Sequence, residues 1–259
     1  MRPGTAALPD GTWANGRVSD PGAVGQALRL VVARNEMTVN RCLIAVSDSI
    51  ATFRVLELDA TATDQQVGVA VTRELVLDPE RFASRWVEVS SSPNRLVYAA
   101  AWDRAAVKAI TDAVHAAGLE PVVMELKSAA LARTVADASY ILLDLSARPA
   151  EIVLVDQHVP RQWHAFEPGE FTTDDGAESL AAPLRSVIRF HQRKRGSTFD
   201  SSCPILVSSE QAVPFQVLSS LSELVAQPVR VMVAPPRVSP AIRYPTYLTC
   251  IGLMMRRES

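Results

Sequence analysis

Residues 140–166 constrain the fold more than any other part of the sequence. They hold three successive runs of aliphatic and β-branched residues, ILLDL, EIVLVD and VPRQWHAF, separated by turn-forming residues. Asp144 closes the first run just before a tight turn that contains Ser146. Such a turn can hold phosphate with its backbone N–H groups, but the close approach normally needs glycine. Because this turn has no glycine, we expect three strands and a phosphate loop that lacks its usual chemistry.

The composition is that of a globular protein with one large domain or two modest ones. The chain has 259 residues, and 48% of them are hydrophobic, which is enough for a sizeable core. No apolar run reaches the roughly 20 residues of a membrane span, and the start lacks the hydrophobic core of a signal peptide. We therefore expect a cytoplasmic protein without a membrane span.

Net charge and cysteine usage exclude several classes of protein. The formal net charge of -2 gives no electrostatic case for binding nucleic acid or anionic lipid. The three cysteines, Cys42, Cys203 and Cys250, are scattered and have no C-x-x-C spacing. They therefore predict neither a disulfide framework nor a zinc site.

Alternating patterns in the first half predict a small α+β unit. The Asp20-Pro21 pair predicts the start of an amphipathic helix over residues 21–35. Beyond it, five short apolar runs predict strands, and residues 64–75 and 103–117 predict helices. We expect residues 41–125 to form a compact unit with its helices on one side of a small sheet.

The second half is predicted to add helices and two more strands, PILVSS and PVRVMVA, to the three strands of residues 140–166. Short helices are predicted over residues 127–137, 213–225 and 244–257. A long helix follows residues 174–175, and its predicted apolar face consists of Leu180, Leu184, Val187, Ile188 and Phe190-His191. The basic cluster Arg193-Lys194-Arg195-Gly196 at its end is interpreted as dipole complement and C-cap rather than as a nucleic-acid patch.

Residues with metal-binding potential do not form a recognisable site. His158 and His164 have no cysteine or third acidic ligand beside them in the sequence, so they do not predict a metal ion. Asp174 and Asp175 precede a helix, and we interpret them as N-caps rather than as a Mg²⁺ pair. Residues 47–49 (Ser-Asp-Ser) are interpreted as a turn and not as a nucleophile.

Four segments, in this order, carry a resemblance to a known family. They are LPDGTWANGRVSDPGAVGQALR, AAWDRAAVKAITDAVHAAGLEPVVMELKSAALAR, residues 140–166 and the closing IGLMMRR. Together they cover most of the chain and resemble the type IV pilus assembly protein PilM family, actin-like ATPases related to the cell-division protein FtsA. The third segment is similar to the family's second phosphate hairpin, D-I-G-x-x-x-T.

This resemblance implies an α/β (α+β) fold of the actin-like, ribonuclease H-like type, with two lobes and a small inserted α+β domain. Residues 1–40 would be the remnant of the first lobe, and residues 41–125 the insert. Residues 126–259 would return to the first lobe and form the second. The family's N-terminal phosphate-binding hairpin, G-I-D-I-G-x-x-S, is expected to be missing. The partner implied is the cytoplasmic tail of PilN, an inner-membrane protein, which would hold the chain peripherally at that membrane.

The resemblance also places a degenerate nucleotide site on five residues. ATP, with Mg²⁺, would lie against Asp144 and Ser146 in the second hairpin and against Ser208, Ser209 and Glu210 in the loop that normally carries a glycine pair. A Cβ at positions where the family has glycine obstructs the approach of the ligand. Asp144 could then serve only to cap its own turn. A scaffold without ATP turnover is the function that this pattern favours.

Other functions stay open at the level of the sequence. One is an active actin-like ATPase or a sugar-kinase-like enzyme whose first phosphate loop lies in an unannotated N-terminus. Others are an FtsA-like cell-division adaptor and a component of a type II secretion system. The predicted closing helix is apolar nearly all round, which suits burial better than membrane targeting. The oligomeric state is not predicted.

Overall fold

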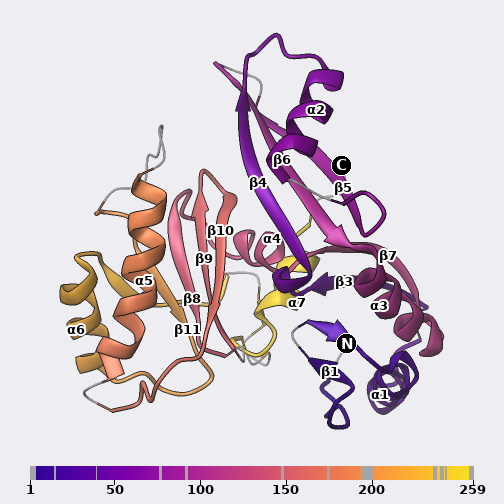
Figure 1. The fold of residues 1–259 in the computed structure, drawn as a ribbon. Coiled ribbons are helices and arrows are strands. Elements are labelled where there is room, and N and C mark those ends of the chain that lie inside the picture. Colours follow the sequence, from indigo (N-terminus) through magenta and orange to yellow (C-terminus); the bar gives the residue numbers. More distant parts are fainter. Residues whose placement is uncertain are drawn as a thin grey trace. The chain divides into compact units, whose positions relative to one another are not determined.

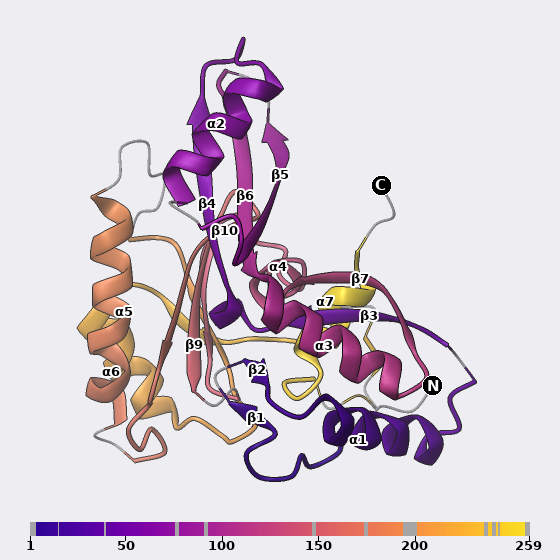
Figure 2. The same ribbon diagram turned by 45° about the vertical axis from the view of Figure 1, so that its right-hand side comes forward.

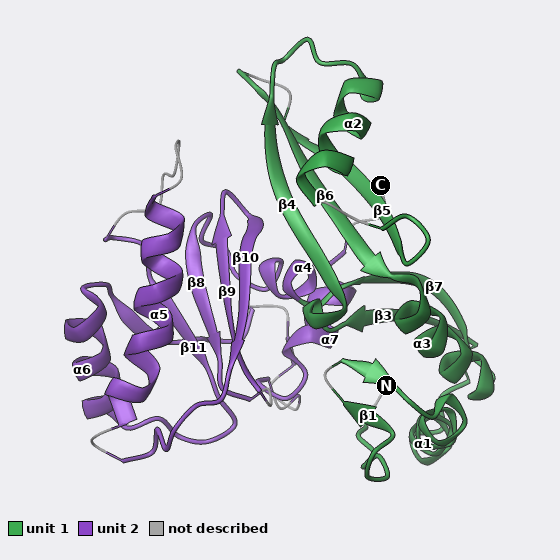
Figure 3. Ribbon diagram, in the orientation of Figure 1, with its two compact units in different colours: residues 1–127 green, residues 128–259 purple. Residues whose placement is uncertain are grey.

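The chain forms two compact units, residues 1–127 and 128–259, shown in Figure 3. The computed structural model describes residues 4–14, 16–38, 40–75, 78–90, 93–146, 149–173, 176–193, 201–235, 238–239, 242 and 244–256. The predicted N-caps Asp174 and Asp175, and Lys194, Arg195 and Gly196 of the basic cluster, lie outside these residues. The finer division of the chain at residues 40 and 125 stays a prediction.

The first unit contains a parallel strand pair with two helices packed against each other beside it. Strand β3 pairs with β7, and α1 lies along α3 (Figure 2). Asp20 caps α1 as predicted, since its carboxylate accepts a hydrogen bond from the Ala23 N–H at 3.0 Å. The elements are the hairpin β1 (Trp13–Ala14) and β2 (Arg17–Val18), α1 (Pro21–Arg34), β3 (Arg41–Val46), α3 (Arg104–Ala116) and β7 (Glu120–Leu126).

The rest of the first unit is a three-stranded antiparallel sheet in the order β4-β6-β5. Helix α2 covers one face of it (Figures 1 and 2). Val67, Val71 and Leu75 of α2 are buried against alternate residues of β6, namely Val97, Ala99 and Ala101. The elements are the 3₁₀ turn η1 (Asp48–Ile50), β4 (Ala51–Leu58), α2 (Asp64–Leu75), β5 (Phe82–Ser90) and β6 (Arg95–Asp103).

Asp103 joins three segments of the first unit at the point where β6 becomes α3. Its Oδ1 accepts hydrogen bonds from the N–H groups of Ala105 and Ala106 at 3.0 and 3.1 Å, which caps the helix. Its Oδ2 lies 3.0 Å from Arg17 Nη2 and 3.3 Å from Arg81 Nε. Burial acts to raise the pKa of this carboxyl, but the hydrogen bonds from Ala106 and the two arginines outweigh it and lower the pKa to about 2.

The second unit is built on a five-stranded sheet in the order β10-β9-β8-β11-β12. The first three strands are antiparallel neighbours, as residues 140–166 predicted, whereas β11 runs parallel to both β8 and β12. The strands are β8 (Tyr140–Asp144), β9 (Ala150–Asp156), β10 (Val159–Phe166), β11 (Ile205–Ser208) and β12 (Val229–Val231).

Helices cover both faces of this sheet, so β8 and β9 are buried along their whole length (Figure 1). One set of alternate residues, which includes Ile141 and Leu143, packs against α5 and α6. The other set, which includes Leu142 and Val153, packs with Leu131 of α4 and Leu248 of α7. Gly252 lets α7 approach α4, since a Cβ there would overlap the Ala130 carbonyl. The helices are α4 (Lys127–Ala132), α5 (Gly176–Gln192), α6 (Phe215–Val225) and α7 (Leu248–Met254).

Two details of the predicted helices were wrong. On α5, Leu180, Leu184, Val187 and Ile188 are buried as expected, but Phe190 is 55% exposed and only its neighbour His191 is buried. At about 100° per residue, His191 lies between Val187 and Ile188 on the buried side, whereas Phe190 lies about 160° from Ile188 and falls outside that side. The short helices also end earlier than predicted: α4 stops at Ala132, and α7 covers only Leu248–Met254.

Candidate functional site

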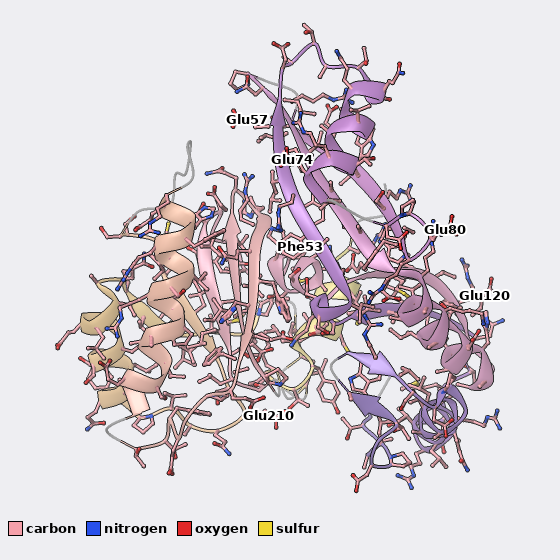
Figure 4. The ribbon with its side chains drawn as sticks, viewed as in Figure 1. Phe53, Glu57, Glu74, Glu80, Glu120 and Glu210 are labelled. Carbon is pink, nitrogen blue, oxygen red and sulfur yellow. The ribbon has the colours of Figure 1, made fainter. Side chains whose placement is uncertain are left out.

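The ends of two neighbouring strands bring together the residues that the sequence predicts for nucleotide binding. Strands β8 and β11 are parallel, and Asp144 is the register partner of Ser208. The Leu145 N–H donates a hydrogen bond to the Ser208 carbonyl at 2.8 Å, which extends the ladder by one residue. Ser209 and Glu210 follow directly, and Figure 4 shows Glu210 in the loop after β11. The five predicted residues therefore lie at one edge of the sheet.

Asp144 holds the turn that follows β8. Its side chain is buried, and its Oδ1 accepts a hydrogen bond from the Ser146 N–H at 3.0 Å. This is the local cap that the sequence interpretation expects of an aspartate at the start of a glycine-free turn. This oxygen of the Asp144 carboxylate is therefore already hydrogen-bonded within its own turn.

The structure adds Glu151 to this edge, a residue that the sequence analysis did not single out. Glu151 is the second residue of β9, directly after Ala150, and is the antiparallel partner of Asp144. Both side chains are buried and share one face of the sheet with Ser208, because partners directly opposite each other point the same way. The sequence alone could not pair Glu151 with Asp144, because the pair depends on the register between β8 and β9.

Two serine hydroxyls at the same edge are buried without a hydrogen-bond partner among the described residues. They are Ser146 Oγ, in the turn, and Ser208 Oγ, at the end of β11. Ser209 is half-buried, and its Oγ accepts a hydrogen bond from the Gln211 N–H at 3.2 Å. Glu210 is exposed. The hydroxyls are able to donate to a small polar ligand, since leaving them unpaired is unfavourable.

These residues do not fit a tightly held triphosphate. Residues 119–168 contain no glycine, so a close backbone approach to phosphate is not available on β8, β9 or the turn between them. Asp144, Glu151 and Glu210 bring carboxylates to the edge where an anionic ligand would lie. In the part of the chain that the structure describes, no group of three or more His, Cys, Asp or Glu side chains could hold a metal ion.

A second candidate surface lies in the first unit, on the face of β4-β6-β5 opposite α2. Tyr98 points to this face, between Val55 of β4 and Val87 of β5. Phe53, labelled in Figure 4, stacks on Tyr98 with ring centroids 5.6 Å apart. Val87 is 52% exposed. The sequence predicted the strands but not which of their faces α2 would cover, so it could not rank these residues.

The two outer strands of this sheet, β4 and β5, also have backbone hydrogen-bonding groups along their outer edges. Strands β4 and β5 each pair only with β6 among the described residues. An unpaired strand edge can accept an extended peptide as an additional strand. An apolar face beside two such edges is the arrangement that peptide recognition by strand addition requires.

Among the described residues, no helix has both the length and the apolar character that crossing a membrane would require.

Comparison with known proteins gives structural matches only. No family model matches the sequence, and no curated protein does. A solved structure of a PilM-PilN type IV pilus biogenesis complex matches with a TM-score of 0.69 and 18% sequence identity, over 95% of this chain and 88% of that chain.

Two other solved structures match over most of their length. The cytoplasmic domain of EpsL, an inner-membrane component of the type II secretion system of Vibrio cholerae, matches with a TM-score of 0.56 and 12% identity, over 90% of this chain and 82% of that one. The ethanolamine utilization protein EutJ from Carboxydothermus hydrogenoformans matches with a TM-score of 0.54 and 13% identity, over 94% and 77%. The predicted α/β fold of actin-like type is confirmed, and the fold of this chain is PilM-like.

Proposed function

We propose that this chain is a PilM-like cytoplasmic scaffold of type IV pilus assembly. It binds the cytoplasmic tail of an inner-membrane, PilN-like partner and is held peripherally at the membrane by that contact. The observation that carries the proposal is the apolar face of β4-β6-β5, with Val87 exposed on it and two strand edges beside it. The fold match to a PilM-PilN complex supports the choice of partner.

The mode of binding that we propose is strand addition with apolar side-chain pockets. A tail in extended form would pair its backbone with the edge of β5 or β4 and place alternate side chains over Tyr98 and Val87. Main-chain hydrogen bonds would then supply affinity, and the apolar face would supply selectivity for the tail. The predicted insert, residues 41–125, would be the receiving domain.

The nucleotide edge is, in this proposal, a degenerate site that binds Mg²⁺-ATP weakly and does not hydrolyse it. Support comes from the cap that Asp144 makes with Ser146, from the three carboxylates at the edge, and from the absence of glycine in residues 119–168. Calorimetry with Mg²⁺-ATP and an assay of phosphate release test this directly. A saturable tight-binding isotherm, or phosphate release that Asp144→Asn abolishes, would favour the ATPase alternative instead.

Binding of the tail is tested with a synthetic peptide from the cytoplasmic end of the inner-membrane protein encoded beside this chain. Val87→Asp places a charge on the proposed face and is expected to weaken binding by at least about tenfold, as for a central interface residue. Val69→Asp is the matched control, since Val69 is 65% exposed on the outer side of α2. Its affinity is expected to stay within about twofold of the parent.

Equal loss in both variants, or no binding by the parent chain, would count against the proposal. A component of a type II secretion system is the second candidate, because the EpsL domain shares the fold. The same fluorescence-anisotropy titration, repeated with tails from a pilus system and from a secretion system, separates the two.

A further inference from the structure

The outer side of α5 carries a basic surface that the proposed partner binding does not use. Ala182, Arg185, Ser186, Arg189, Phe190 and Arg193 line a shallow depression of about 440 Å³ there, and we call this the arginine face. Its three arginines are four residues apart, so Arg185 and Arg189 lie on one side of α5, and Arg193 follows directly after the helix ends at Gln192. The buried side of α5 packs against the sheet and leaves this face to solvent.

The charge of this region departs from that of the whole chain. The sequence from residue 179 to residue 199 contains five arginine and lysine residues and no aspartate or glutamate, whereas the complete chain has 26 basic and 28 acidic residues. Arg185 is partly compensated, with Nη2 3.6 Å from Glu178 Oε2 and Nη1 donating to the Leu224 carbonyl at 3.4 Å. Arg189 and Arg193 form no ion pair with any described residue.

Helix stability accounts for only part of the arginine face. The helix dipole favours basic side chains at the C-terminal end, which explains Arg189 and Arg193 but not Arg185. Like charges four residues apart destabilise a helix by a few tenths of a kcal/mol per pair. Phe190 is in addition 55% exposed beside them. An anionic surface that covered this face would offset the repulsion between neighbouring arginines.

We propose that the arginine face binds an anionic phospholipid surface. A helix that presents several basic side chains with an aromatic residue among them is suited to lie on such a surface, with the arginines at the phosphates and the ring at the acyl boundary. The depression is broad and shallow and has one aromatic side chain, Phe190. A single-stranded nucleic acid would need several aromatic rings for stacking, and an acidic peptide would pair with the arginines but give the exposed ring of Phe190 no apolar partner.

The experiment is flotation of the full chain with vesicles. We expect binding to vesicles rich in phosphatidylglycerol, loss of that binding at high salt, and no binding to pure phosphatidylcholine. The double variant Arg189→Gln and Arg193→Gln is expected to weaken binding by about fivefold for each arginine removed. Both side chains are exposed, Arg189 on α5 and Arg193 directly after its end, so circular dichroism of the variant is expected to match the parent.

The matched control is the double variant Arg34→Gln and Arg41→Gln. It makes the same change in net charge at two exposed positions of the first unit, in α1 and β3. Its vesicle binding is expected to be unchanged. Binding that both double variants weaken equally would show general charge attraction and overturn the proposal, as would no binding of the parent chain to anionic vesicles.

A third variant, Phe190→Ser, separates the ring from the charges. It is expected to weaken binding severalfold while leaving the salt dependence as it is, because no phosphate contact is lost. The face would be assigned to an acidic peptide, and lipid rejected, by the following result: the chain binds a poly-glutamate peptide, the arginine substitutions weaken that binding, and vesicles are not bound. The tail peptide is absent from the flotation assay, so the lipid and tail proposals fail independently.

Discussion

The two units build their sheets from similar residues but cover them differently. Strands β8 and β9 of the second unit are buried at every position between helices on both faces, whereas β5 of the first unit is mostly exposed or half-buried. The five-stranded sheet therefore forms a core that tolerates little change. The three-stranded sheet has one face covered by α2, and Val87 is exposed on the other, which is where we propose that the partner binds.

The same comparison extends to the ends of strands. Asp144 ends β8 at an edge with two further acidic residues, Glu151 and Glu210. Asp103 ends β6 between two arginines and a helix N-terminus. The two aspartates occupy similar places in their sheets, and the helix N-terminus and the two arginines beside Asp103 lower the pKa of that carboxyl to about 2. Surroundings, rather than position at a strand end, decide what a buried carboxylate does.

The largest expected effect comes from truncating matched valines in the two sheets. Val153→Ala removes two methyl groups from a fully buried position of β9 and is expected to lower the free energy of unfolding by about 2 to 3 kcal/mol. Val87→Ala, on the open face of β5, is expected to cost less than about 0.5 kcal/mol. Denaturant unfolding followed by circular dichroism measures both. If both substitutions lowered the free energy of unfolding equally, Val87 would be packed as closely as a core residue.

A smaller effect is expected from two glycines in the covering helices. Gly252→Ala in α7 forces a Cβ against the Ala130 carbonyl of α4 and is expected to cost about 2 kcal/mol through overpacking. Gly68→Ala in α2 has no atom within 4 Å of the added Cβ and is expected to stabilise the chain by about 0.5 to 1 kcal/mol. Thermal unfolding of the two variants shows whether each substitution raises or lowers the stability of the chain. A stabilising Gly252→Ala would contradict the close packing of α4 and α7.

The smallest effect concerns Asp103 and acid. Because its folded-state pKa is lowered to about 2, its contribution is present above the unfolded pKa of about 4 and is lost as the pH falls through the folded value. Asp103→Ala is expected to cost about 1 kcal/mol at neutral pH from the lost cap. The difference between parent and variant should shrink as the pH falls from about 4 toward 2. A difference that is independent of pH in this range would show that the folded protein does not lower the pKa of Asp103.

Local patterns predicted most elements of the fold because their causes are local. The three runs of residues 140–166, the Asp20 cap and the Asp103 cap all appear where the sequence places them. Helix ends were less predictable, since α7 covers only Leu248–Met254 although the sequence predicted a helix over residues 244–257. The exposure of Phe190 and the burial of His191 depended on which side of α5 meets the sheet.

The candidate sites show the same limit more sharply. The sequence could name Asp144 and Ser208, but only the parallel register of β8 and β11 makes them neighbours, and only the antiparallel register with β9 adds Glu151. The net charge of -2 gave no reason to expect binding to anionic lipid. A sum over the chain contains no information about where the charges lie, so it could not reveal the arginine face. Side-chain periodicity, turns and caps are decided between residues close in sequence. Registers, covered faces and charged surfaces are decided between distant residues, and so required the tertiary structure.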